Sequence, residues 1–397
     1  MIMLKLLIVA DDFTGALDTG VQFASLGASA KVVTSPQCDS SQLKGLDVLI
    51  FDAESRHKDP SIAYKKVYDF VKSAASLGVE YVYKKTDSGL RGNIGAELAG
   101  AMDALGMDSM AFIPAFPAMN RVTKGGVHYI NGVPVGKSMF AEDPFNPVKY
   151  SDVREIIASQ TDKQGIRVYD AESDSDMEKI AASLGSAGLK MTAGCAGFGK
   201  ILAKVLGFNG KPKEVHGLPE RFLMLCGSVN PVTRAQMDFA AKHGFKYMAL
   251  SPEQKLNPAW PESPECREAA KKWLAEIVKC NAVLDANDPA ETEQTNNYIK
   301  AHSLSLEEVM HNISHAVAGA GKALIDAGLD ARLMCVGGDT LLALMKAVGV
   351  TELVPMCEIA LGVVLTSFEY SGKRYYIMTK SGGFGEPDLL VNLAGKF

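Results

Sequence analysis

Short apolar runs alternate with amphipathic runs along the first half of the chain. We expect buried strands at residues 4–10, 30–34, 46–52, 79–83 and 109–114. Residues 14–27 and 61–78 lie between these runs and have the apolar spacing of helices. Continuous apolar strands that alternate with helices are typical of βαβ units and a mostly parallel sheet. The pattern therefore predicts an α/β fold.

A polar segment with proline and glycine, NGKPKEVHGLPER, indicates a linker at residues 209–221. We therefore place the domains at residues 1–212 and 213–397. After the linker we expect strands in RFLMLCGS, FKYMALS and ARLMCVGGD, a helical region at 263–326 interrupted by NAVLDAND, and a hairpin at 362–380. An earlier hairpin is expected in HYINGVPV, because Asn-Gly favours its turn. The chain is expected to form two α/β lobes with mostly parallel sheets, and an interdomain cleft is a common place for a small-molecule site.

Polar and charged side chains gather where strands of the first lobe end. ADDFTG follows the first strand, AESRH the third and KKTDSGLRGN the fourth. Ligands of open parallel sheets bind beyond the carboxyl ends of the strands, so these turns are expected to share one rim. Helix capping explains each turn taken alone. The capping residues would be Asp12 or Thr14 in the first turn, and Asp87, Ser88 or Asn93 in the last.

Capping does not explain the four cations at the same rim, Arg56, Lys84, Lys85 and Arg91. Cations near helix N-termini oppose the helix dipole unless an anion joins them. The combination predicts a site for a small, hydroxylated anion. Arginine and lysine would hold its carboxylate, while aspartate and serine would meet its hydroxyl groups.

Strand ends of the second lobe are rich in glycine. They are LCGSVNPVT (225–233), CVGGDT (335–340) and TKSGGFGEPD (379–388). Such turns let backbone N–H groups approach phosphate oxygens, and three in one lobe favour nucleotide binding over tight connections alone. The segment Gly132–Ser138 is one residue short of a P-loop and overlaps the predicted hairpin. No G-x-G-x-x-G follows a strand, which argues against a Rossmann dehydrogenase.

Composition and charge argue against nucleic-acid and membrane partners. The chain has 397 residues, 47% of them hydrophobic, and a net charge of −5 without a basic block, which argues against nucleic acid. No apolar segment is long enough to span a membrane. Seven cysteines without a C-x-x-C spacing, and no signal-peptide pattern at the N-terminus, favour a cytoplasmic protein. No metal site is expected, since His311 and His315 lack an acidic residue between them suited to catalysis. The sequence leaves a homodimer open.

The motifs together resemble a known family. IADDFTGALDTG, DAESRH and KKTDSGLRGNIGAEL resemble the N-terminal domain of the four-carbon acid sugar kinases, and CVGGDT and KSGGFGEPD resemble its C-terminal nucleotide-binding domain. Their order and spacing cover nearly the whole chain. The resemblance implies ATP-dependent phosphorylation of D-threonate, D-erythronate or a 3-oxo-tetronate at the terminal hydroxyl, with Mg²⁺. Residues 1–212 would bind the acid sugar and residues 213–397 the nucleotide.

The resemblance also implies residue roles. It implies sugar-acid contacts by Asp12, Arg56 and the run Lys85, Thr86, Asp87 and Ser88. Asp11 and Lys84, which lie at the same strand ends, are added to this set. The ATP contacts are Ser251, Gly337, Gly338, Asp339, Thr340, Ser381, Gly382, Gly383, Phe384 and Gly385. Arg56 and Lys85 would anchor the carboxylate, and Asp12 or Asp87 would act as general base. Arg91 would neutralise charge on the transferred group, and Asp339 would help hold Mg²⁺ through water.

Three positions depart from the family pattern. Gly89 stands where the family usually has threonine, Asp339 where it has glutamate and Gly383 where it has asparagine. The missing hydroxyl at position 89 leaves the substrate and its stereochemistry open. Two other classes remain, a hydroxy-acid dehydrogenase or aldolase on a similar frame, and a non-catalytic cytosolic sugar-acid-binding protein.

Overall fold

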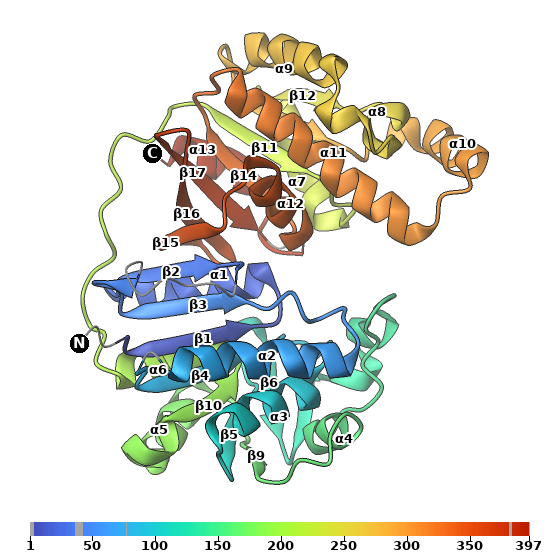
Figure 1. Ribbon diagram of the computed structural model, residues 1–397. Coiled ribbons are helices and arrows are strands. Elements are labelled where there is room, and N and C mark those ends of the chain that lie inside the picture. The colour runs from blue at the N-terminus through green and yellow to red at the C-terminus, as the bar shows by residue number, and fades with distance from the viewer. Residues whose placement is uncertain (1–3, 36–42, 77, 381–382, 397) are drawn as a thin grey trace. The chain divides into compact units, whose positions relative to one another are not determined.

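The computed structural model describes residues 4–35, 43–76, 78–380 and 383–396. The chain divides into two compact units, Met1–Lys213 and Glu214–Phe397 (Figure 1). The strands of the main sheet of the first unit are β1 (Leu6–Ala10), β2 (Ala30–Val33), β3 (Val48–Asp52), β4 (Tyr81–Lys85), β5 (Met110–Ile113), β9 (Ile166–Val168) and β10 (Met191–Gly194). They lie in the order β2-β3-β1-β4-β10-β5-β9. Every neighbouring pair is parallel.

The register of this sheet decides where the site lies. Ala10, the last residue of β1, pairs with Asp52 at the end of β3 and with Lys85 at the end of β4. Three strands therefore end level with one another. Because they are parallel, the turns that follow them leave from the same edge of the sheet.

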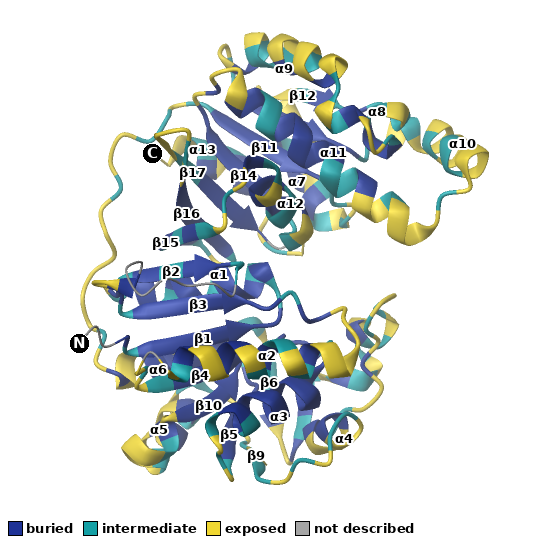
Figure 2. Ribbon diagram, viewed as in Figure 1, coloured by how far each residue is buried: buried dark blue, intermediate teal, exposed yellow. Residues whose placement is uncertain are grey.

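Helices cover both faces of this sheet. They are α1 (Phe13–Ala24), α2 (Pro60–Ala75), α3 (Ile94–Leu105), α4 (Val153–Ala158), α5 (Asp174–Leu189) and α6 (Ala196–Val205). α2 packs against α3 and α3 against α4, while α1 packs against α6 and α6 against α5. Figure 2 shows α3 buried nearly all round, whereas α2 keeps an exposed outer face. A small antiparallel sheet, β6 (Arg121–Lys124), β7 (Val127–Ile130) and β8 (Val133–Pro134), follows β5.

The second unit has a mixed sheet. Its strands are β11 (Phe222–Cys226), β12 (Lys246–Ala249), β13 (Ala282–Asp285), β14 (Arg332–Val336), β15 (Glu352–Ala360), β16 (Val363–Tyr370) and β17 (Lys373–Lys380). The order is β12-β13-β11-β14-β17-β16-β15. It is parallel from β12 to β17 and antiparallel from β17 to β15. The helices are α7 (Pro231–Lys242), α8 (Pro252–Leu256), α9 (Pro264–Ile277), α10 (Thr292–His302), α11 (Leu306–Asp326), α12 (Gly338–Val348) and α13 (Leu389–Gly395).

The predicted α/β class and mostly parallel sheets are confirmed. The predicted apolar face of residues 61–78 is buried in α2 through Ala63, Val67, Phe70, Val71 and Ala74, while Leu77 lies outside the described residues. Both predicted hairpins form, and Asn131 and Gly132 turn the first with φ of 51° and 80°. The interruption NAVLDAND was predicted only as a break between helices, whereas it contains β13, a strand inside the sheet. Among the described residues, no helix is long and apolar enough to cross a membrane.

Candidate active site

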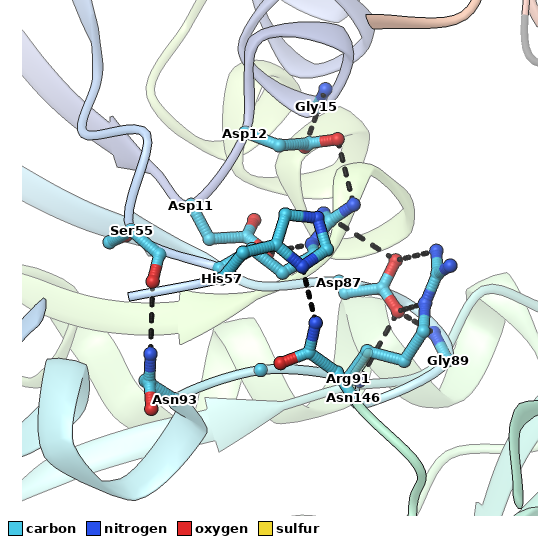
Figure 3. A network of polar contacts seen from close by, with 12 residues as sticks. Asp11, Asp12, Gly15, Ser55, His57, Asp87, Gly89, Arg91, Asn93 and Asn146 are labelled. Atoms are coloured by element: carbon cyan, nitrogen blue, oxygen red, sulfur yellow. Dashed lines mark hydrogen bonds and ion pairs between the residues drawn. The ribbon is translucent and has the colours of Figure 1, made fainter. Parts of the chain in front are cut away.

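The ends of β1, β3 and β4 bring three aspartates around one arginine. Arg56 Nε donates to Asp11 Oδ2 at 2.7 Å, and Arg56 Nη1 lies 2.8 Å from Asp12 Oδ2. Arg56 Nη2 lies 3.7 Å from Asp87 Oδ1. Figure 3 shows Asp11 and Asp12, from the turn after β1, close to Asp87, from the turn after β4. The predicted rim therefore exists as one connected ionic network.

Asp12 also caps α1, which is the role that helix capping alone predicts for this turn. Gly15 N donates to Asp12 Oδ1 at 2.9 Å at the N-terminus of α1. The side chain of Asp12 remains 26% exposed, whereas Asp11 is 2% and Asp87 9% exposed. Of the three carboxylates, Asp12 is therefore the most accessible to a ligand.

Lys85 extends across the start of α1. Its Nζ lies 3.4 Å from Asp11 Oδ1 and 3.8 Å from Asp12 Oδ1. A Cβ atom added to Gly15 would lie 2.0 Å from Lys85 Nζ. Glycine at position 15 thus leaves the space that the ammonium group occupies.

Lys84 points to the other face of the sheet. Successive side chains of a strand point to opposite faces, and Lys84 Nζ lies 2.7 Å from Glu97 Oε2 in α3. Both side chains are almost completely buried. The structure therefore separates Lys84 from the other predicted sugar-acid contacts. Thr86 is likewise buried, and its Oγ1 has no hydrogen-bond partner among the described residues.

Asp87 organises the turn after β4. Its Oδ2 accepts from Gly89 N and Arg91 N, both at 3.2 Å. Arg91 also binds it with two nitrogens, Nε to Oδ2 at 2.8 Å and Nη2 to Oδ1 at 3.1 Å. Arg91 Nη1 continues to Asp143 Oδ2 at 3.1 Å. Asn93 occupies the N-cap position of α3, but its side chain makes no cap hydrogen bond.

Charge sets the protonation of the network. Burial would raise the pKa of Asp11, but Arg56, Lys85 and Lys84 outweigh it and hold that pKa well below its usual value. Burial likewise acts upward on the pKa of Asp87, and Arg91 and Arg56 reverse the effect. Both carboxyl groups are therefore ionised at neutral pH.

The sequence analysis missed Asp52, the last residue of β3. Burial, with repulsion from Asp12, Glu54 and Asp11, raises its pKa to about 8, although the N–H of Glu54 opposes this. Within the described part of the chain, the Oδ2 atom of Asp52 has no hydrogen-bond partner. In the sheet, Asp52 pairs with Ala10, the residue directly before Asp11 and Asp12. An aspartate at the end of an apolar strand is the sequence signal for this position.

Ser88 is held by residues that the sequence analysis also missed. Arg121 Nη1 donates to Ser88 Oγ, and His128 Nε2 lies 3.0 Å from the Ser88 carbonyl oxygen. The Phe140 ring lies beneath the guanidinium groups of Arg91 and Arg121, 5.0 and 5.3 Å from their Cζ atoms. Phe140 fills the place where residue 89 would carry a side chain, since a Cβ on Gly89 would lie 2.8 Å from its Cζ.

In the second unit, the three glycine-containing turns follow β11, β14 and β17, which are neighbours in the sheet. A Cβ on Gly227 would lie 3.2 Å from Thr340 Oγ1, and a Cβ on Gly383 would lie 3.8 Å from Asn230 Nδ2. Gln236 Nε2 donates to the carbonyl oxygens of Phe384 and Gly385, each at 2.9 Å. The three turns thus lie together at one edge of the sheet.

Gly337 is the N-cap residue of α12. Its φ of 92° favours glycine, and its N–H donates to Lys380 O at 3.1 Å. Gly338 and the exposed Asp339 form the first turn of α12. Lys380 is buried, and its Nζ donates to Thr233 Oγ1 at 3.3 Å. Burial lowers the pKa of Lys380 to about 8, and an anion at this edge would strengthen its charged form.

One predicted ATP contact, Ser251, stands apart from these turns. Ser251 caps α8, where its Oγ accepts from Gln254 N at 3.3 Å and its N–H donates to Gln254 Oε1 at 2.9 Å. The helix follows β12, which β13 and β11 separate from β14 in the sheet. Ser381 and Gly382 lie outside the described residues.

Two family models match the chain. The one described as a sugar-binding N-terminal domain matches residues 6–168, and the one described as a nucleotide-binding C-terminal domain matches residues 223–390. Together they cover both regions in which the predicted residues gather.

Curated relatives match over nearly the whole chain. A D-threonate kinase of Salmonella typhimurium is 28% identical over 98% of this chain and 97% of its own. A D-erythronate kinase of Heliobacterium modesticaldum is 27% identical over 89% of each chain, and a 3-oxo-tetronate kinase of Methylobacterium radiotolerans is 25% identical over 96% of each.

Solved structures share the fold. A Salmonella typhimurium protein matches with a TM-score of 0.83 and 20% identity over 100% of both chains. A Haemophilus influenzae protein matches with a TM-score of 0.75 and 20% identity over 98% of this chain and 100% of its own. At this identity the likeness is one of fold alone.

Proposed function

The chain belongs to the four-carbon acid sugar kinase family, and from this membership we propose that it transfers the γ-phosphoryl group of ATP to the terminal hydroxyl of a four-carbon sugar acid. The acid is D-threonate, D-erythronate or a 3-oxo-tetronate, the substrates in the names of its relatives. One observation carries the proposal. The rim with the ionic network lies in the region that matches the sugar-binding model, and the glycine turns lie in the region that matches the nucleotide-binding model.

The hydroxyl groups of the substrate are assigned to the Arg56 network. Arg56 and Lys85 were expected to anchor a carboxylate, but aspartates already surround both cations. We therefore give them the role of fixing the aspartate carboxylates, which accept hydrogen bonds from hydroxyl groups. Fixed charges of this kind stabilise a transition state without reorganisation of the site.

Asp12 is the general base in this proposal. It is the most exposed of the three aspartates, while Asp87 already accepts hydrogen bonds from Arg91 and from two backbone N–H groups. An attacking hydroxyl needs a carboxylate that still has a lone pair to accept its proton. Asp87 then positions Arg91, whose cation neutralises charge on the transferred group.

The glycine turns of the second unit are assigned to the phosphates of ATP, through Gly337, Gly338, Thr340, Gly383 and Gly385. The N-terminus of α12 adds its dipole, and Lys380 adds a cation at the end of β17. Mg²⁺ neutralises phosphate charge in such reactions. Among the described residues no group of three or more acidic, histidine or cysteine side chains is placed to hold a metal ion, so we propose that Mg²⁺ enters with the nucleotide. Asp339 would contact it through water.

Coupled ADP release over a panel of threonates, erythronates and 3-oxo-tetronates tests the proposal. We expect ADP with at least one of these acids, and loss of turnover in Asp12→Asn and Asp87→Asn while the circular dichroism spectrum of the folded protein is retained. Wild-type activity in both variants would refute the assignment of the aspartates.

The same panel separates the other classes. Absence of ADP with every acid, together with calorimetric binding of one of them, would favour a non-catalytic sugar-acid-binding protein. A change in nicotinamide absorbance would favour a dehydrogenase, and borohydride trapping of a lysine with substrate would favour an aldolase.

A further inference from the structure

Arg121 reaches the sugar-binding rim from outside the main sheet. It is the first residue of β6, and its Nη1 donates to Ser88 Oγ in the turn after β4. The carbonyl oxygen of the same serine lies 3.0 Å from His128 Nε2. Burial lowers the pKa of His128 to about 4, so the ring is neutral at neutral pH and donates through Nε2. Both polar groups of Ser88 are therefore fixed beside the guanidinium group.

The other cations of the rim already have carboxylate partners. Arg56 lies within 4 Å of three aspartates, Lys85 of two, and Arg91 of Asp87 and Asp143. Within the described part of the chain, no carboxylate lies within 4 Å of the Arg121 guanidinium group. Its neighbours are a hydroxyl group and the Phe140 ring. Among the described residues, Arg121 thus differs from Arg56, Lys85 and Arg91 in having no carboxylate within ion-pair distance.

This location is poorly hydrated. Burial lowers the pKa of Arg121, an effect that the charge of Asp87 opposes and that of Arg91 reinforces. A partly buried cation without a counter-ion is costly, and an incoming carboxylate would relieve that cost. A guanidinium group is suited to this ligand, because its planar N–H groups match the two oxygens of a carboxylate.

We propose that Arg121 binds the carboxylate of the sugar acid, with Ser88 Oγ donating a second hydrogen bond, and so selects acids over neutral sugars of the same length. This rests on the proposed kinase function. The substrate then lies with its carboxylate at Arg121 and its hydroxyl groups toward Asp87 and Asp12. In this arrangement Arg56 and Lys85 keep their ion pairs with the aspartates and do not contact the substrate carboxylate.

A purely structural role is the competing explanation. Arg121 would then only hold Ser88 and cover Phe140, and its loss would loosen the turn for every substrate equally. The two roles differ in one measurable respect, because only a carboxylate contact distinguishes an acid from a neutral molecule with the same hydroxyl groups.

The experiment compares the full-length wild type with Arg121→Gln, Arg121→Lys and the control Lys124→Gln. Lys124 lies on the same strand, and its exposed side chain pairs with Glu172. The coupled assay measures KM and kcat for the best sugar acid of the panel, for the tetritol with the same hydroxyl configuration, and for ATP. For Arg121→Gln we expect kcat/KM for the acid to fall about 10- to 100-fold, mainly through KM. The kcat/KM for the tetritol and the KM for ATP should change by less than about threefold. A threefold change corresponds to less free energy than one charged hydrogen bond contributes.

Arg121→Lys should lie between wild type and Arg121→Gln, and Lys124→Gln should match wild type. Equal losses for acid and tetritol, or an unchanged KM for the acid, would overturn the proposal. If Arg121→Gln does not fold, Arg121→Lys decides by the same comparison. If the wild type releases no ADP with any acid, the proposed function fails instead, and calorimetric binding of the acids to wild type and Arg121→Lys still tests the carboxylate contact.

Discussion

Gly89→Ala tests whether Phe140 accounts for the glycine in the turn after β4. Gly89 does not adopt a positive φ, so the backbone itself accepts a side chain at this position. The added Cβ would lie 2.8–2.9 Å from three ring atoms of Phe140. The ring is 7% exposed and belongs to the core of the first unit. It therefore has to shift as a whole for the methyl group to fit.

The expected cost follows from these contacts. Overpacking a core by a methyl group costs about 1–3 kcal/mol. A shifted ring also weakens its contacts with Arg91 and Arg121, each worth about 0.5–1 kcal/mol. We expect a loss near 2 kcal/mol, which lowers the unfolding temperature of a unit of this size by about 4–8 °C.

Thermal unfolding of four proteins provides the assay, namely wild type, Gly89→Ala, Phe140→Ala and the double variant. Once the ring is absent, the methyl group should cost nothing further, so the double variant should resemble Phe140→Ala. Gly395→Ala is the control, because no atom of the described residues lies within 4 Å of its added Cβ, and it should not lower the unfolding temperature. Additive losses, within about 0.5 kcal/mol, would refute the reasoning.

Three further predictions concern the network around β4. Gly15→Ala places a methyl group 2.0 Å from Lys85 Nζ, so turnover should fall up to about 100-fold while circular dichroism stays unchanged; wild-type kinetics would contradict this. The pKa of Asp52 is raised to about 8, so the carboxyl group contributes its full stability below pH 4, and this contribution is lost as the pH rises through 8. In Asp52→Asn the unfolding temperature should therefore depend less on pH between pH 4 and 8. A pH dependence equal to that of the wild type would contradict this prediction. Lys84→Met leaves Glu97 buried without a partner and should cost about 3–5 kcal/mol of unfolding free energy, whereas Lys84→Met with Glu97→Leu should recover most of it; equal losses would refute this.

The sheets were largely predictable, because buried parallel strands leave continuous apolar runs in the sequence. The strands that escaped prediction lack that signal. β13 has only four residues and follows directly on a helical pattern. β15 contains Pro355 and mixes buried with exposed positions, as strands at sheet margins do.

The rim was predictable in position but not in pairing. The carboxyl ends of parallel strands meet at one edge, which placed Asp11, Asp12, Arg56 and Asp87 together. Side-chain alternation along β4 places Lys84 and Lys85 on opposite faces of the sheet, so the sequence already contains the signal that separates them. Arg121 and Phe140 come from the segment after β5, whose packing onto the rim depends on contacts distant in sequence.

The two lysines of β4 have a consequence for how the sheet assembles. Lys84 pairs with Glu97 on the face covered by α3, and Lys85 pairs with Asp11 on the opposite face. A one-residue slip of β4 would exchange the faces of its side chains. A slip in one direction would set Tyr83 opposite Glu97, and a slip in the other would set Thr86 opposite Asp11. The first slip would leave the buried carboxylate of Glu97 without a lysine, and the second would remove Lys85 from Asp11, so this lysine pair favours the native register over both shifted registers.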